Sequence, residues 1–208
     1  MYTLDDILER WIPYRLQAVE TLQFAWLWAA ESDEPREVTV HVDGNLKIKG
    51  NVAAVANPMI EAGIIHARAL LEFMGLCASK GRLAQIIKRR KDDVAIEHYS
   101  TAQFPLCHVK LEEALAAYAG PAHEAETALL AIFDLANKGH AHLTLCAPST
   151  NYTDDHIDIA CRGIPVLLNN HLYAKLGRKI PEPPSAVLNG GQPIISAGRL
   201  RRPLNSHD

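Results

Sequence analysis

The chain has 208 residues, of which 48% are hydrophobic and 22% charged, so it is long enough for one sizeable domain with a hydrophobic core. Its formal net charge of -3 provides no overall attraction to nucleic acid, so RNA binding has no support from the net charge. No stretch reaches the roughly 20 consecutive apolar residues that span a membrane. Because the four cysteines lack CxxC spacing and the N-terminus lacks a basic and apolar leader, a cytoplasmic location is predicted.

The first predicted helix runs from Leu4 to Ala30, where apolar residues recur at helical spacing. Pro13 is expected to kink this helix or to end a first short one. The aromatic cluster from Trp26 to Trp28 belongs either to the core or to a subunit contact, and the core is favoured.

A β-hairpin is predicted from Arg36 to Gly50, where apolar and polar residues alternate. A three-residue loop, Asp43 to Asn45, is favoured over the two-residue loop Asp43-Gly44 because it sets apolar residues against one another. The expected pairs are Val42 with Leu46 and Val40 with Ile48. Since two isolated strands are marginally stable in water, this face should pack on a helix or on another subunit, and a homodimer is predicted.

A second helix is predicted from Asn57 to Ala78, with Asn57 as the N-cap and Pro58 at the first helical position. Apolar residues fill one broad face of this helix. His66 lies at the margin of that face, beside Phe73. The opposite side carries charged residues at spacings that suit exposed ion pairs, namely Glu61, Arg68 and Glu72.

The rest of the chain is predicted to be mainly helical. From Ser79 to Pro105 we expect a short helix followed by irregular chain. Further helices are expected from Val109 to Ala119, from Ala122 to Leu143, and from the N-cap Thr153 to Leu172 with a kink at Pro165. Residues 1–176 should form a single helical domain, and the proline- and glycine-rich residues 177–208 should form an extended tail.

Two histidine-bearing segments, residues 64–73 and 137–144, are expected to meet in space. Polar groups set among apolar helix residues must find partners or act chemically. The candidate site residues are His66, Arg68, Glu72, Asn137, Lys138 and His142. A histidine in such a partly dry place can serve as a general base or a ligand, although most are satisfied core residues.

A metal site has less support. On one helix His140 and His142 would lie about 200° apart, so both can face one metal only if the helix ends near Gly139. The best remaining ligand set is His66, His142 and a carboxylate. The chain has no Gly-rich phosphate loop, no GxSxG and no HExxH, so no cofactor is predicted.

A basic run extends from Lys88 to Lys91, and the tail adds Arg199, Arg201 and Arg202. Such groups can contact phosphates. Because Asp92 and Asp93 follow the run at once, an ordinary solvated surface is the favoured interpretation.

The segment His66-Ala67-Arg68, together with the later Asn137-Lys138 and His142-Leu143-Thr144, resembles a set of bacterial helical proteins of unknown function. It also resembles, distantly, the HEPN helical domains. The ribonuclease members of that family carry an arginine, a polar residue and a histidine four to six intervening residues on. Here Asn137 stands where the arginine belongs, so Lys138 or Arg68 would have to hold the phosphate from another position.

The expected fold is an all-α bundle of about five or six helices with one small β-hairpin. The leading functional hypothesis is a binding or interaction module at the helix pair that carries His66 and His142. The alternatives are a HEPN-like ribonuclease or toxin-system component, and a metal-dependent enzyme. A pocket lined by these side chains would favour binding or catalysis, whereas a close-packed interior would favour a structural role.

Overall fold

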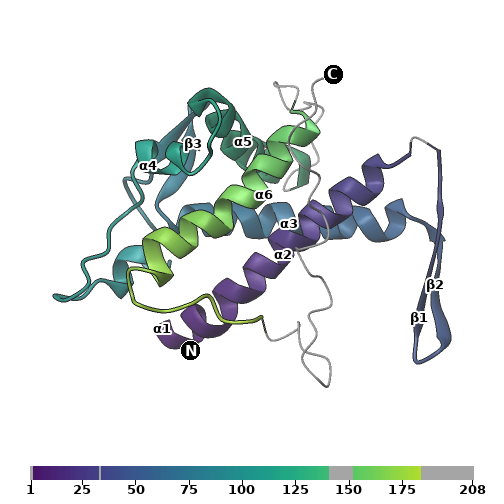
Figure 1. The fold of residues 1–208 in the computed structure, drawn as a ribbon, viewed down its shortest axis with the longest axis horizontal. Coiled ribbons are helices and arrows are strands. Elements are labelled where there is room, and N and C mark those ends of the chain that lie inside the picture. Colours follow the sequence, from purple (N-terminus) through teal and green to yellow (C-terminus); the bar gives the residue numbers. More distant parts are fainter. Residues whose placement is uncertain (1, 33, 141–151, 184–208) are drawn as a thin grey trace.

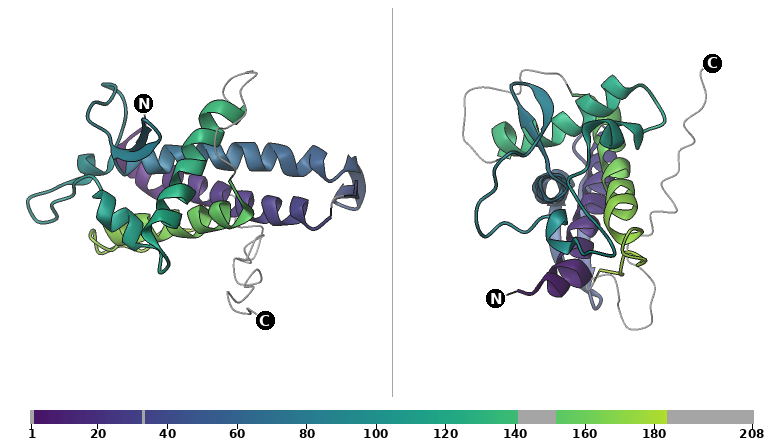
Figure 2. Two further views of the ribbon diagram at one scale, coloured as in Figure 1. Left: turned by 90° about the horizontal axis from the view of Figure 1, so that it is seen from above. Right: turned by 90° about the vertical axis from the view of Figure 1, so that its left-hand side faces the viewer.

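The computed structural model describes residues 2–32, 34–140 and 152–183, and its fold is dominated by helices (Figure 1). Two long antiparallel helices, α2 (Ile12–Ala30) and α3 (Ala53–Phe73), lie at its centre. Helix α6 (Asp154–Leu168) runs beside them, and α5 (Ala122–Asp134) packs on α6 (Figure 2). The predicted helical fold is confirmed, but the described residues contain two small antiparallel hairpins, not one.

Helices α2 and α3 approach each other closely at Gly63. A Cβ atom at this position would lie 2.4 Å from the Cβ of Leu22 and 2.7 Å from the carbonyl oxygen of Ala18. Only glycine leaves room for that approach. The contact is surrounded by fully buried side chains such as Leu22 and Ile64, so it belongs to the main core.

The first predicted helix is confirmed as three contiguous pieces, which are α1 (Leu4–Asp6), the π-helical turn η1 (Ile7–Trp11) and α2. Thr3 and Asp6 cap its start through reciprocal hydrogen bonds. Pro13 lies in the first turn of α2, where its missing N–H is tolerated, so the proline does not end the helix.

Two tyrosines from later in the chain anchor this first segment. The hydroxyl of Tyr173 donates a hydrogen bond of 2.6 Å to the carbonyl oxygen of Leu8. The hydroxyl of Tyr99 donates one of 2.8 Å to the carbonyl oxygen of Leu4. Burial raises the pKa of both phenols, so they remain neutral donors.

The predicted first hairpin is confirmed as β1 (Glu37–Val42) and β2 (Asn45–Asn51), but the predicted loop is wrong. Asp43 and Gly44 have φ angles of 52° and 76°, which are typical of a two-residue turn, and Asn45 already pairs with Val42. An irregularity after Val40 shifts the register, so Val40 still pairs with Ile48 as predicted.

This hairpin sits at the far end of the α2–α3 pair, away from the main core (Figure 1). We call this end the arm; it comprises β1–β2 with the adjoining turns of α2 and α3, from Ala25 to Ala56. A small second core holds it together, made of Ala25, Val38, Val52 and Ala56. The apolar tip remains open, with exposed fractions of 49%, 52% and 44% for Val42, Leu46 and Ile48.

Trp26 and Trp28, near the end of α2, are half-buried. Trp28 packs on the second core and Trp26 on the main core. The indole N–H of Trp26 also donates a hydrogen bond to Asp154.

Helix α3 differs from its prediction at both ends. It begins at Ala53, where the side-chain oxygen of Asn51 accepts the Ala53 N–H, so Pro58 lies inside the helix rather than at its start. It ends at Phe73 rather than Ala78 because Gly75, with φ of 91°, turns the chain away.

The prediction of a short helix and irregular chain from Ser79 to Pro105 is wrong at its start. Strands β3 (Leu76–Ser79) and β4 (Arg82–Gln85) form a second hairpin. Its turn, Lys80-Gly81, has φ angles of 52° and 75°. Leu76 and Leu83 are buried against the main core, and the only helical residues in the rest of that range form the 3₁₀ turn η2 (Ile96–Tyr99).

The later predicted helices are confirmed with changed bounds. They are α4 (Leu111–Ala116), α5 continued by the π-helical η3 (Leu135–His140), and α6 continued by the π-helical η4 (Asn169–Tyr173), with Pro165 inside α6. The start of the predicted tail contacts η1, where Arg178 forms an ion pair with Glu9 at 2.7 Å. Within the described ranges, no helix combines the length and apolarity needed to cross a membrane.

Candidate functional site

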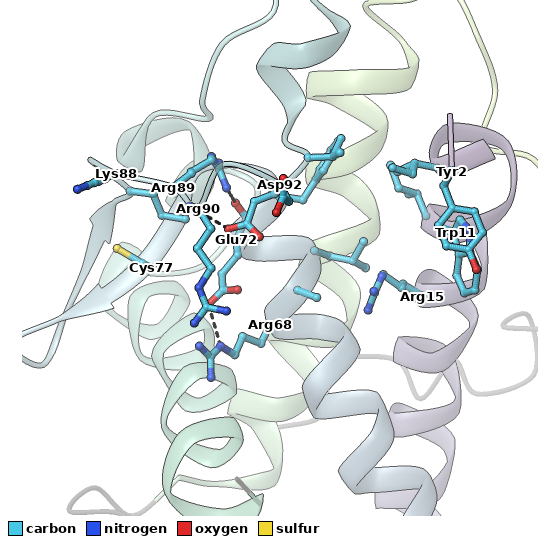
Figure 3. Close-up of a pocket in the computed structure, with 18 of the residues that line it drawn as sticks. Tyr2, Trp11, Arg15, Arg68, Glu72, Cys77, Lys88, Arg89, Arg90 and Asp92 are labelled. Atoms are coloured by element: carbon cyan, nitrogen blue, oxygen red, sulfur yellow. Dashed lines mark hydrogen bonds and ion pairs between the residues drawn. The ribbon is translucent and has the colours of Figure 1, made fainter. Parts of the chain in front are cut away.

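An open hollow of about 890 Å³ lies where η1 and α2 face the C-terminal turns of α3 and the segment 86–94 (Figure 3). This volume is in the range typical of small-molecule sites. Tyr2 and Trp11 line one end, and apolar side chains such as Ile12 and Leu70 line the interior. The remaining lining is charged, with Arg15, Arg68, Lys88, Arg89 and Arg90 against Glu72, Asp92 and Asp93.

Arg15 lies between the aromatic end and α3, and its guanidinium points from α2 toward α3 (Figure 3). It is half-buried, and its Nη1 donates a hydrogen bond of 2.8 Å to Nδ1 of His66. Across the described ranges, no carboxylate pairs with Arg15. Burial lowers the pKa of this guanidinium without neutralising it, so Arg15 is a desolvated cation on the wall of the hollow.

His66 must be neutral while it accepts the hydrogen bond from Arg15, because only an unprotonated Nδ1 has a free lone pair. Burial, and then the charge of Arg15, lower its pKa. The rings of Tyr14 and His66 pack edge to face, with their centroids 5.3 Å apart. These contacts make His66 a support that orients Arg15 rather than a lining residue of the hollow.

Arg68 joins three of the residues predicted from sequence. Its Nε donates to the carboxylate of Glu72 at 2.8 Å, and its Nη1 donates to the side-chain oxygen of Asn137 at 2.5 Å. Helix α3 is thereby connected to η3, as expected for the two histidine-bearing segments. Arg68 and Glu72 both line the hollow, and Asn137 supports Arg68 from η3.

The other predicted residues are not brought into this group by the described structure. His142 lies outside the described residues, as do the side chains of Lys138 and of His140, one of the metal candidates. Within the described ranges, no three His, Cys, Asp or Glu side chains are grouped so that they could hold a metal ion. His156 accepts a hydrogen bond from the Thr153 N–H at the start of α6.

Arg89 also lines the hollow, and its guanidinium makes two hydrogen bonds. Its Nε donates to Glu97 at 3.2 Å and its Nη1 to the carbonyl oxygen of Glu72 at 2.7 Å, while His108 Nε2 lies 2.9 Å from the same Glu97 carboxylate. Burial raises the pKa of Glu97, but the bond with His108 and the charge of Arg89 outweigh it and lower the pKa overall. Glu97 therefore remains ionised and neutralises Arg89.

Sequence reasoning missed Arg15 and Trp11 and assigned the run from Lys88 to Lys91 to an ordinary solvated surface. The first three residues of this run line the hollow, and in Figure 3 Arg90 extends toward Arg68 while Lys88 points outward. The signal available was the spacing of Trp11 and Arg15, one helical turn apart, which places both on one face of the helix. Their meeting with residues 86–94 depends on tertiary structure.

The chain matches no protein family, no curated protein and no solved structure.

The cysteine that lines the hollow is a poor candidate for a nucleophile. Burial, and then the charge of Glu72, raise the pKa of Cys77, which lines the hollow. A raised pKa disfavours the thiolate, which is the nucleophilic form of cysteine. What the hollow offers to a ligand is a desolvated guanidinium, aromatic rings and an apolar floor.

Proposed function

We propose that this protein binds a small anionic molecule in the hollow beside His66. The observation that carries the proposal is Arg15, a half-buried cation that pairs with no carboxylate in the described part of the chain. The other two buried guanidinium groups of the hollow differ, because Arg68 is paired with Glu72 and Arg89 with Glu97. An anionic ligand would supply the missing counter-charge.

The hydrogen-bond capacity of Arg15 supports this role. A guanidinium has five N–H donors in a planar fork, and His66 accepts only one of them at Nη1. The donors that remain suit a carboxylate or phosphate group. A hydrogen bond to such a charged group contributes about 1.5–3 kcal/mol.

Isothermal titration calorimetry with inorganic phosphate, acetate and benzoate tests the proposal. We expect at least one of these anions to bind with a Kd on the order of 1 mM or lower. Arg15→Gln should raise that Kd about tenfold or more. Lys47→Gln on the hairpin of the arm is the matched control, since it removes the same charge from an exposed site. No binding of any anion to the folded protein would refute the proposed function.

We also propose that the protein forms a homodimer through the tip of the arm. The proposal is supported by the open apolar side chains Val42, Leu46 and Ile48. Light scattering should give the mass of a dimer for the unmodified chain and of a monomer for Leu46→Asp. A monomer at high protein concentration would contradict it.

A further inference from the structure

The aromatic end of the hollow is built from rings that already contact one another. Tyr2 and Trp11 have ring centroids 5.1 Å apart with an interplanar angle of 69°. Both side chains line the hollow, Trp11 is partly exposed, and Tyr2 is 67% exposed. Edge-to-face geometry of this kind leaves ring faces available for a further planar group.

The desolvated cation lies directly beside this aromatic end. Trp11 and Arg15 are one helical turn apart, and Figure 3 shows Arg15 between Trp11 on one side and α3 on the other. The wall between them is apolar, with Ile12 and Leu70. A guanidinium also stacks well on a planar ring, which an ammonium group does less well.

The charge pattern limits how many separate anionic groups a ligand can bring. Arg68 and Arg89 are each neutralised by a carboxylate, at 2.8 Å and 3.2 Å. Asp92 and Asp93 line the hollow together with Lys88 and Arg90. A polyanion would meet those aspartates, whereas a single anionic group at Arg15 would not.

We propose that the ligand is an aryl anion, a planar aromatic ring that carries one acidic group, with the ring against Trp11 and Tyr2 and the acidic group at Arg15. This inference rests on the proposed function and adds the chemical class of the ligand. It distinguishes the hollow from a general anion site, because the aromatic end selects for the ring and Arg15 selects for the charge.

The test compares phenyl phosphate with cyclohexyl phosphate by isothermal titration calorimetry on the full chain. The two esters carry the same anionic group, and only one has a π system. We expect phenyl phosphate to bind about two- to tenfold more tightly, as ring–ring contacts beyond simple burial imply. Equal affinity, or tighter binding of the cyclohexyl ester, would overturn the inference and leave the proposed function standing. If neither ester binds, the proposed function itself fails.

Variants locate the preference. Trp11→Leu should abolish the difference between the two esters while cyclohexyl phosphate still binds, and Trp28→Leu in the arm should keep the difference. A preference that survives Trp11→Leu would also overturn the inference. Should Trp11→Leu fail to fold, Tyr2→Leu at an exposed position replaces it, with a reduced preference expected.

Discussion

The two ends of the α2–α3 pair use the same local structures with opposite burial. At one end, which we call the hollow end, the hairpin β3–β4 packs on the main core and its Leu83 is 6% exposed. At the other end, the arm, hairpin β1–β2 has a similar two-residue turn, but its Leu46 is 52% exposed. The comparison teaches that the alternation of apolar and polar residues predicts the exposed hairpin β1–β2, whereas the hairpin β3–β4 is stabilised by tertiary packing.

The most direct test of this difference makes the same substitution in both hairpins. Leu83→Ala should lower the free energy of unfolding by about 2–5 kcal/mol because it removes a buried side chain. Leu46→Ala should change it by less than about 0.5 kcal/mol in the monomer. Chemical denaturation measures both values, and similar losses would show that the arm is as tightly packed as the core.

Gly63 lies between the two ends, where α2 and α3 approach each other closely. Gly63→Ala should destabilise the protein by about 1–3 kcal/mol, because the added Cβ overlaps Leu22 and the backbone of Ala18. In the control Gly163→Ala the new Cβ meets nothing within 4 Å, so helix propensity should make that variant neutral or more stable. A melting temperature that rises in both variants would contradict the close approach of the helices.

At the hollow end, Tyr173→Phe removes the hydroxyl that binds the Leu8 carbonyl oxygen. The expected loss is about 1–2 kcal/mol, since a buried acceptor is left without its donor. Tyr14→Phe is the control, because that tyrosine is 42% exposed and its stability effect should be close to zero. Urea denaturation compares the two, and an equal response would remove the proposed anchoring role of Tyr173.

The smallest effect concerns the pH dependence of stability. The pKa of His66 is lower in the folded protein, first through burial and then through Arg15, so the unfolded chain binds more protons between that pKa and the unperturbed value of about 6.5. Stability should therefore fall as pH falls through this window. His66→Gln should flatten this decrease, although His171, whose pKa burial also lowers, keeps part of it. Identical pH profiles would contradict the Arg15–His66 contact.

The helical fold was accessible from sequence where periodicity is strong, but several boundaries were not. The alternation of Val38, Val40 and Val42 predicted β1, whereas the four residues of β3 carry too little pattern to separate them from α3. Asn57-Pro58 has the composition of a helix start, yet α3 begins at Ala53, where the side-chain oxygen of Asn51 accepts the Ala53 N–H. Two local signals therefore competed for the start of α3, and the one at Asn51 prevailed.

The candidate site was accessible only in part for the same reason. Arg68, Glu72 and Asn137 were predicted because they lie on recognisable helix segments, and the structure brings them into one hydrogen-bonded group. Apart from its spacing of one helical turn from Trp11, Arg15 carried no local signal, since its significance comes from an environment without a carboxylate. The run from Lys88 to Arg90 has a surface-like composition, and only the turn at Gly75 and the β3–β4 hairpin bring it to the hollow.

The tyrosine anchors have a consequence for how the protein matures on the ribosome. The hydroxyl that binds the Leu8 carbonyl belongs to a residue 165 positions later. At translation rates of about 5–20 residues per second, the first segment waits on the order of ten seconds for this partner. The hydrogen bond at Leu8 can therefore form only after η4 has been synthesised, so the final contacts of the first segment require an intact C-terminal half.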